Sequence, residues 1–404
     1  MRALLWSAKL HDGLKIAFIS LLLLSLAACS LLPSQLASPA QQISPGQQVT
    51  EEPPKVLAPL SAARIKPQLL WQHKLHPLQP GYIKLHPTLS GNTLFAADKN
   101  NIFALNKNNG KILWKKTLDE TITGGLNTGK DSVFVGTENG MAIALDSNTG
   151  KTRWISLLEQ PIVAISTEKK GKVVFRTLNG KIHALSSTNG DLLWLHTQRT
   201  PTLSLQGSST PLLAGPLVVT GFDNGSVVAY DLDTGKEAWS IKLGSESNLT
   251  ELSRLVDIDA EMKTVGTALF AASYQGFLAG IDMRSGRVGW KRPISSYSGI
   301  DANEQELFIT DNQGNLWKLN PLTGEPVWKN DDLIRRSPTA PSLATKSLLI
   351  VGDKLGYLHW YNTVKGETIG RVHADSSSYL LAPLVQGRTV YAISRNGLLS
   401  AYRF

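Results

Sequence analysis

The sequence predicts an all-β fold, an eight-bladed β-propeller whose blades are four-stranded antiparallel sheets. Two observations support this prediction. A unit of sixteen residues recurs with little change, as "NGMAIALDSNTGKTRW" at 139–154, "NGKIHALSSTNGDLLW" at 179–194 and "NGSVVAYDLDTGKEAW" at 224–239. The 334 residues from Trp71 to Phe404 also divide into eight units of about 42, a length typical of propeller blades.

Each part of the unit predicts one element of a blade. A glycine opens a strand, and the alternation in "KIHALS" (181–186) has the period of a half-buried strand. A Thr-Gly-Lys type of turn follows, whose glycine can take the positive φ that a short hairpin loop needs. A second strand then carries a tryptophan, which we expect to wedge between neighbouring blades. The turn glycines are Gly110, Gly150, Gly190, Gly235, Gly286, Gly324 and Gly366, and the tryptophans are Trp71, Trp114, Trp154, Trp194, Trp239, Trp290 and Trp328.

The two ends of the repeat region each carry half a blade. The region begins with "QLLWQHKL" (68–75), a Trp strand without its glycine strand, and finishes with "NGLLSAYRF" (396–404), a glycine strand without its Trp strand. We expect these two strands to pair and close the ring, because closure hides strand edges that an open array would expose. One copy departs from the pattern, since Gly370 stands where a tryptophan is expected.

The start of the chain, residues 1–28, is predicted to be a lipoprotein signal peptide. Three basic residues precede the apolar run "IAFISLLLLSLAA" (16–28), the pattern of a secretory signal. The sequence "LAAC" (26–29) places a small-residue cleavage site against the single cysteine and resembles the lipobox of bacterial lipoproteins. The resemblance implies that Cys29 becomes the acylated first residue, held on a membrane by its acyl chains. Ser30 after it implies sorting to the outer membrane.

Two further regions follow the signal peptide. Pro, Gln and Ser dominate residues 30–66, where no apolar periodicity is present. We therefore expect 29–66 to be an acylated N-terminus with a flexible tether, and 67–404 to be the propeller.

Composition excludes several classes of function. The net charge is +9, but the basic residues are scattered without a run of five, so no nucleic-acid partner is expected. A single cysteine allows no intramolecular disulfide and no Cys-pair zinc site. The stretch "GGLNTGKD" (124–131) has Asp131 where a phosphate loop needs Ser or Thr. We therefore expect no cofactor, no metal and no enzymatic activity.

Two alternative functions stay open. The repeat resembles that of quinoprotein dehydrogenases, which are also eight-bladed. Members that hold pyrroloquinoline quinone commonly use a vicinal cysteine pair, with Glu, Asn and Asp around calcium, whereas the only cysteine here lies in the lipobox. The alternatives are therefore a PQQ-dependent dehydrogenase-like quinoprotein and a structural lipoprotein that binds cell-wall polymer.

Two insertions interrupt the repeat in consecutive units. The two longest Trp-to-Trp spacings, 45 and 51 residues, contain "RTPTLSLQGSSTP" (199–211) and "GSESNLTELSRLVDIDAEM" (244–262). Leu203 and Leu205 lie on one side of the first, and Asp257 and Asp259 alternate with Ile258 in the second. A hydrophobic pair beside an acidic pair on one rim favours a partner-binding patch. The alternative is a pair of long solvated loops whose leucines point inward.

The whole chain resembles the BamB family, lipoprotein subunits of the machinery that assembles β-barrel proteins in bacterial outer membranes. The most specific stretches are "LSL" (203–205), "SRLVDID" (253–259) and "GDKLGYLHW" (352–360). The resemblance implies a non-enzymatic scaffold whose two inserted loops dock on the periplasmic POTRA domains of the barrel-inserting subunit BamA. It further implies that the protein aids the folding and insertion of outer-membrane proteins.

The resemblance also assigns roles by position. Leu203 and Leu205 would make the apolar contacts, while Asp257 and Asp259 would support the loop or meet basic groups. Gln206 stands where the family often has Arg, so a charge is absent from the polar contact there. The implied form is a monomer within a hetero-complex, lipid-anchored at the periplasmic face of the outer membrane. Unfolded outer-membrane proteins are a further expected partner.

Overall fold

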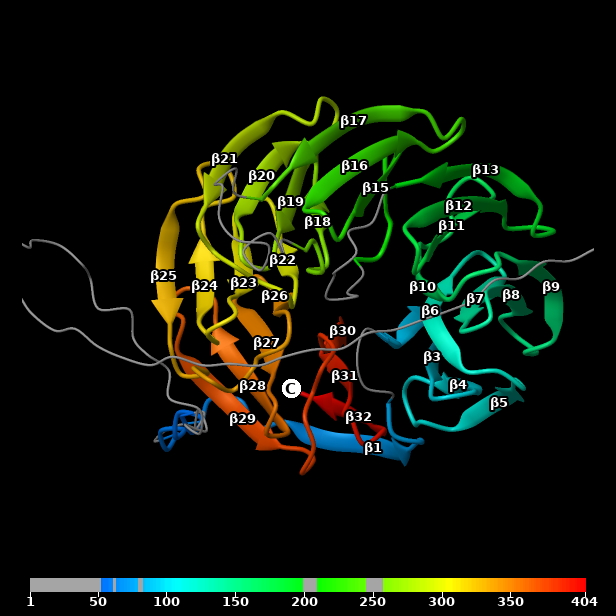
Figure 1. The fold of residues 1–404 in the computed structure, drawn as a ribbon. Coiled ribbons are helices and arrows are strands. Elements are labelled where there is room, and N and C mark those ends of the chain that lie inside the picture. The colour runs from blue at the N-terminus through cyan, green and yellow to red at the C-terminus, as the bar shows by residue number, and fades with distance from the viewer. Residues whose placement is uncertain (1–51, 61–62, 79–82, 199–208, 245–256) are drawn as a thin grey trace, which may run out of the picture. The chain divides into compact units, whose positions relative to one another are not determined.

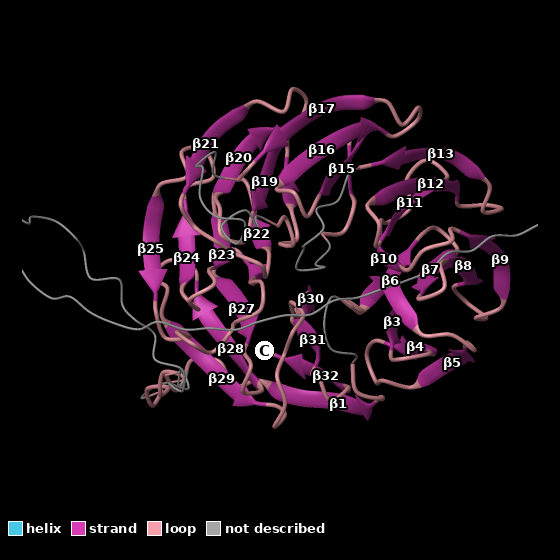
Figure 2. Cartoon of the chain, in the orientation of Figure 1, coloured by secondary structure: helices cyan, strands magenta, loops and turns pink. Residues whose placement is uncertain are grey.

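The computed structural model describes residues 52–60, 63–78, 83–198, 209–244 and 257–404, all within the unit Glu52–Phe404. The regular structure of these residues is entirely β-strand, in eight antiparallel four-stranded sheets arranged as the blades of a ring (Figure 1, Figure 2). The predicted all-β, eight-bladed propeller is therefore confirmed. None of the described residues belongs to a helix able to span a membrane.

The blades are numbered in chain order. Within each blade the four strands are given in order from the centre of the ring outward (Figure 1). Blade 1 contains β2 (Thr88–Ser90), β3 (Thr93–Ala97), β4 (Asn101–Asn106) and β5 (Ile112–Thr117). Blade 2 contains β6 (Ile122–Thr128), β7 (Ser132–Thr137), β8 (Met141–Asp146) and β9 (Thr152–Leu157). Blade 3 contains β10 (Ile162–Ile165), β11 (Lys172–Thr177), β12 (Lys181–Ser186) and β13 (Leu192–Thr197). Blade 4 contains β14 (Leu212–Ala214), β15 (Leu217–Gly221), β16 (Ser226–Asp231) and β17 (Glu237–Lys242).

The second half of the ring repeats this plan. Blade 5 contains β18 (Lys263–Val265), β19 (Ala268–Ala272), β20 (Leu278–Asp282) and β21 (Val288–Arg292). Blade 6 contains β22 (Ile300–Ala302), β23 (Leu307–Thr310), β24 (Leu316–Leu319) and β25 (Pro326–Asn330). Blade 7 contains β26 (Ser342–Thr345), β27 (Leu348–Gly352), β28 (Tyr357–Asn362) and β29 (Thr368–His373). Blade 8 contains β30 (Leu384–Gln386), β31 (Thr389–Ile393), β32 (Leu398–Arg403) and β1 (Gln68–Lys74).

Blade 8 closes the ring with strands from both ends of the described chain. Strand β1 pairs antiparallel with β32, so that Trp71 lies opposite Ala401 and Gln72 opposite Ser400. Figure 1 shows the blue β1 beside the red β32. The predicted pairing of the two half-blades is therefore confirmed, and it gives the last glycine strand the partner that its own sequence lacks.

The hydrophobic core is divided among the junctions between blades. Eight clusters of buried apolar side chains are present in the described chain, and each draws its members from two adjacent blades. At the junction of blades 2 and 3, for example, Phe134 and Trp154 pack against Phe175. Because one blade cannot cover both of its faces, burial requires a neighbour on each side.

Each tryptophan of the repeat reaches across to the following blade. Its indole Nε1 donates a hydrogen bond of 2.8–3.1 Å to a main-chain carbonyl of that blade. Its ring also lies on the turn glycine of that blade: a methyl group at Gly235 would lie only 2.7 Å from ring atoms of Trp194. Gly235 has a φ of 71°, so glycine is required both for the backbone and for the space the ring occupies. The predicted wedge is thus confirmed.

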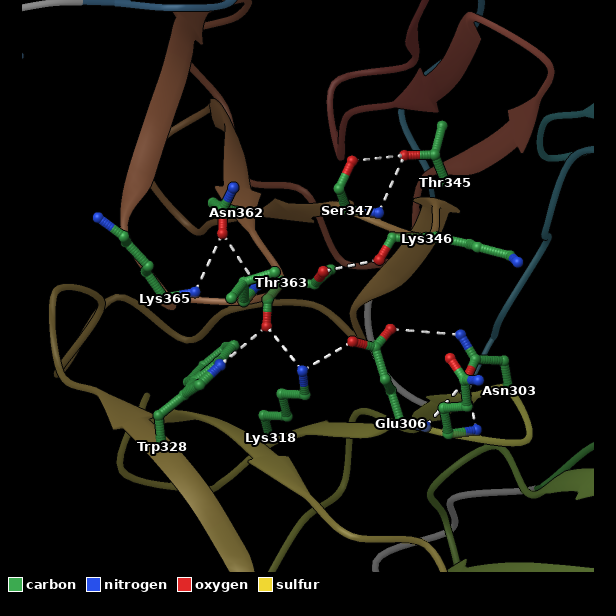
Figure 3. A network of polar contacts seen from close by, with 12 residues as sticks. Asn303, Glu306, Lys318, Trp328, Thr345, Lys346, Ser347, Asn362, Thr363 and Lys365 are labelled. Carbon is green, nitrogen blue, oxygen red and sulfur yellow. Dashed lines mark hydrogen bonds and ion pairs between the residues drawn. The ribbon is translucent and has the colours of Figure 1, made fainter.

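Polar contacts reinforce the junction of blades 6 and 7, shown in Figure 3. Trp328 Nε1 and Lys318 Nζ both donate to the carbonyl of Thr363, at 2.9 and 3.0 Å. Lys318 also forms a 2.7 Å ion pair with Glu306. The Thr363 carbonyl therefore accepts two hydrogen bonds. These replace the hydrogen bonds to water that the carbonyl loses on burial.

The described part of the predicted tether, residues 52–60 and 63–66, contacts blades 6 and 7. Lys55 Nζ forms a 2.7 Å ion pair with Asp331. The N–H of Ile65 donates to the carbonyl of Ile369 in β29 at 3.0 Å. These contacts attach this part of the segment to the outside of the propeller.

Candidate partner-binding rim

The structure describes two of the predicted site residues, Asp257 and Asp259, which directly follow the undescribed stretch 245–256. The remaining predicted residues lie outside the described chain: Cys29, Leu203, Leu205 and Gln206.

The ends of the two insertions meet at Gly221, the last residue of β15. Ser209, just after the stretch 199–208, accepts a 3.1 Å hydrogen bond from the Gly221 N–H at its Oγ. Ile258, just after 245–256, packs on the same glycine, where a methyl group would collide with both Ile258 and Ser209. The sequence placed both insertions after the Trp strands of adjacent blades, and their described ends do lie side by side. We call Ser209, Gly221 and the segment 257–262 the insertion rim.

Asp257 and Asp259 lie inside the protein and not on its surface. Their exposed fractions are 1% and 6%, and Ile258 between them is buried at 1%. The main-chain oxygen of Asp257 accepts from the Tyr274 N–H at 2.8 Å, and that of Asp259 accepts from Lys84 Nζ at 2.7 Å. Both main-chain oxygens are therefore held by groups of the propeller itself.

A buried ion pair lies close to the Asp259 carboxyl. Arg176 of β11 and Asp223 are joined at 2.5 Å with exposed fractions of 3% and 6% for their side chains, and the guanidinium lies over the Phe222 ring. Burial raises the pKa of Asp259; the negative charges of Asp223 and Glu261 act in the same direction, while Lys84 and Arg176 act against it. No motif in the sequence marks this cluster, because its members come from several blades or their connections.

A cavity of about 250 Å³ lies among the inner strands beside the rim. Glu261 accepts hydrogen bonds there from the Thr210 N–H and hydroxyl, at 3.3 and 3.0 Å. Burial lowers the pKa of His86, which also lines the cavity. In the described chain no three His, Cys, Asp or Glu side chains are grouped as a metal would need. Among the described residues that line it, the cavity offers hydrogen-bonding groups but no paired nucleophile and base.

The outermost strands of blades 1–3 expose a series of aliphatic side chains. These are Ile112 and Leu113 in β5, Ile155 and Leu157 in β9, and Leu192, Leu193 and Leu195 in β13, with exposed fractions of 41–67%. An outermost strand has hydrogen-bonding groups without a partner strand on its outer side. We call these three strands the apolar edges. Their exposure does not follow from the sequence pattern, because it depends on each strand being the last of its blade.

Comparison with known proteins identifies relatives along most of the chain. A family model described as "Outer membrane protein assembly factor BamB" matches residues 63–125 and 98–330. The outer membrane protein assembly factor BamB of Pseudomonas aeruginosa is 45% identical over 322 residues, which cover 80% of this chain and 84% of the relative. The corresponding protein of Escherichia coli K12 is 35% identical over 334 residues, covering 78% of this chain and 85% of the relative.

Solved structures show the same propeller. The crystal structure of BamB from Moraxella catarrhalis matches with a TM-score of 0.76 and 27% identity, over 84% of this chain and 100% of that chain. A europium-containing methanol dehydrogenase matches with a TM-score of 0.66 and 16% identity, over 83% of this chain and 85% of that chain. Identity this low shows a shared fold alone.

The raised pKa of Asp259 predicts a pH-dependent effect of Asp259→Asn. The folded protein holds this carboxyl proton to higher pH than the unfolded chain does. As pH rises from 3.8, the usual pKa of an aspartate, through the higher pKa of Asp259 in the folded protein, ionisation of the wild-type carboxyl therefore lowers the stability of the folded protein. Asparagine cannot ionise, so we expect the variant to gain stability relative to wild type as pH rises from about 4 to 7. Urea unfolding at several pH values measures the difference in free energy of unfolding between the variant and wild type. A difference that stays constant or falls as pH rises would contradict a raised pKa for Asp259.

Proposed function

Because the chain belongs to the BamB family of outer membrane protein assembly factors, we propose that it works as a scaffold that holds other proteins and performs no covalent chemistry. Its function is outer membrane protein assembly. The observation that carries this conclusion is the 45% identity over 322 residues, which extends across most of the propeller. The methanol dehydrogenase likeness gives no support to a quinoprotein reaction, since it concerns the fold alone.

The two insertions, whose described ends meet at the insertion rim, are the proposed contact with the barrel-inserting subunit BamA, through its POTRA domains. Leu203 and Leu205 would fill apolar pockets on the partner, with Gln206 beside them. The described ends of both insertions support this proposal because they are held together on Gly221. The buried segment at Asp257 and Asp259 holds the described end of the second insertion against the propeller.

The apolar edges are the proposed contact with unfolded outer-membrane proteins. An extended chain can add a strand to an exposed sheet edge, with main-chain hydrogen bonds giving affinity. Three neighbouring blades offer such edges lined by leucine and isoleucine, for example Ile155 and Leu157 with exposed fractions of 54% and 67%. Barrel strands alternate apolar and polar residues, so their apolar faces suit these side chains.

The proposed location is the periplasmic face of the outer membrane. Residues 1–28 would be removed, acyl chains on Cys29 would enter the bilayer, and 67–404 would form the propeller as a single copy within the assembly complex. The contacts of residues 52–60 and 63–66 with blades 6 and 7 support a tether whose free part is shorter than 29–66.

The partner contact is tested by replacing the two leucines of the first insertion. We expect Leu203→Ala with Leu205→Ala to reduce co-purification with BamA about tenfold or more, because buried hot-spot contacts each contribute about 2 kcal/mol. The measurement is quantitative co-purification from solubilised membranes. Wild-type recovery of BamA would remove both leucines from the site.

A matched control comes from the apolar edges. Ile155→Ala with Leu157→Ala removes the same kind of side chain from β9 and leaves the first insertion untouched. We expect this pair to keep BamA but to capture less of an unfolded outer-membrane protein added to the purified chain. Loss of BamA in both double variants would show a general defect and would count against the rim.

The lipid anchor is tested by mass spectrometry of the mature protein. We expect its first residue to be Cys29 carrying acyl chains, because the thiol and the cleavage site adjoin. Cys29→Ala should retain residues 1–28 and carry no lipid. A mature chain that begins elsewhere, or an unmodified Cys29, would contradict the assignment.

A further inference from the structure

The junction between blades 7 and 8 differs from the other seven. In those seven, a tryptophan from one blade covers the turn between the third and fourth strands of the next. Blade 7 has Gly370 at the tryptophan position of β29. Blade 8 has no such turn, because its fourth strand, β1, comes from the other end of the sequence. This junction, which we call the seam, therefore lacks both the wedge and the turn. Figure 1 shows its strands, β29 of blade 7 beside β1 and β32 of blade 8.

The N-terminal segment covers only part of the vacant surface. A methyl group at Gly370 would meet the main chain and side chain of Ile65, so Ile65 lies where a tryptophan would begin. Beside it a cavity of about 590 Å³ remains, with Leu348 and Phe404 among its apolar walls. The cavity is a direct consequence of closing the ring with strands from two ends.

The side chains that line the seam cavity are strongly basic. Arg64, Lys66, Arg388 and Arg403 line it, and no acidic side chain of the described residues does. Within the same part of the chain none of the four forms an ion pair with an acidic side chain. Arg388 Nε donates to the main-chain oxygen of Phe404 at 2.8 Å. An excess of positive charge remains around a partly apolar space.

We propose that the seam cavity binds the phosphate group of an anionic phospholipid. Guanidinium and ammonium groups are the side chains best suited to phosphate, which they hold by charge-assisted hydrogen bonds. The cavity is much larger than an inorganic phosphate ion, and its walls of Ile65, Leu348 and Phe404 suit the apolar part of an amphiphile. This site is separate from the insertion rim and does not depend on the proposed BamA contact.

Vesicle binding tests the proposal with a matched pair of charge variants. The full mature chain carrying Cys29→Ser, which removes the acylation site, is sedimented with vesicles of phosphatidylcholine alone or with phosphatidylglycerol added. We expect binding only with phosphatidylglycerol, and we expect Arg388→Gln with Arg403→Gln to weaken it about tenfold. Arg284→Gln with Arg287→Gln removes the same charge from an exposed turn of blade 5 and should bind as wild type does.

Further measurements distinguish lipid binding in the seam from general surface charge and from binding of soluble phosphate. Thermal unfolding checks that each variant is folded, and Arg64→Gln with Lys66→Gln gives a second test from the opposite wall of the cavity. Equal weakening by the seam and blade 5 pairs would overturn the proposal in favour of non-specific surface charge. Calorimetric binding of inorganic phosphate without a preference for anionic vesicles would overturn the lipid assignment in favour of soluble phosphate.

Discussion

The tryptophan that one blade lays on the turn glycine of the next is the contact on which the remaining structure depends. It occurs at seven junctions, and in each the indole Nε1 also donates to a carbonyl of the neighbouring blade. Glycine and tryptophan recur together because a side chain on the first would collide with the ring of the second. The contact combines apolar packing with a hydrogen bond, so it joins each blade to the next in a defined way.

A ring built this way holds its connections and its outer strands in fixed places. The described ends of the two insertions meet on Gly221 because blades 4 and 5 are held side by side. The apolar edges of β5, β9 and β13 face outward for the same reason. The seam follows from closure with strands from two ends, and it leaves a basic cavity beside Ile65, which lies where the repeat would otherwise place a tryptophan. Rim, edges and seam are thus three consequences of one packing rule.

The sequence was sufficient to predict the blades and the closure of the ring. Both depend on a local pattern that repeats along the chain, in which an opening glycine, a strand, a turn glycine and a tryptophan follow one another at fixed spacing. It was insufficient for the burial of Asp257 and Asp259. Their alternation with Ile258 has the period of a strand with one exposed face, whereas the segment is covered on both sides between neighbouring blades. The Arg176–Asp223 pair spans two blades and depends on how they pack, so no local pattern marks it. Gly370 stood out in the sequence as an exception to the tryptophan pattern. That Ile65 packs on it in place of the tryptophan could not be predicted, because this contact depends on the path of the N-terminal segment.

The most direct measurement of the central contact compares two glycines of blade 4. Gly215 and Gly235 both have positive φ, at 58° and 71°, but a methyl group at Gly215 would meet nothing within 4 Å, whereas at Gly235 it would meet the Trp194 ring. Urea unfolding should show that Gly215→Ala costs about 1 kcal/mol, from backbone strain alone. Gly235→Ala should cost about 1–3 kcal/mol more, because it overpacks the junction. Equal costs for the two substitutions would contradict the account.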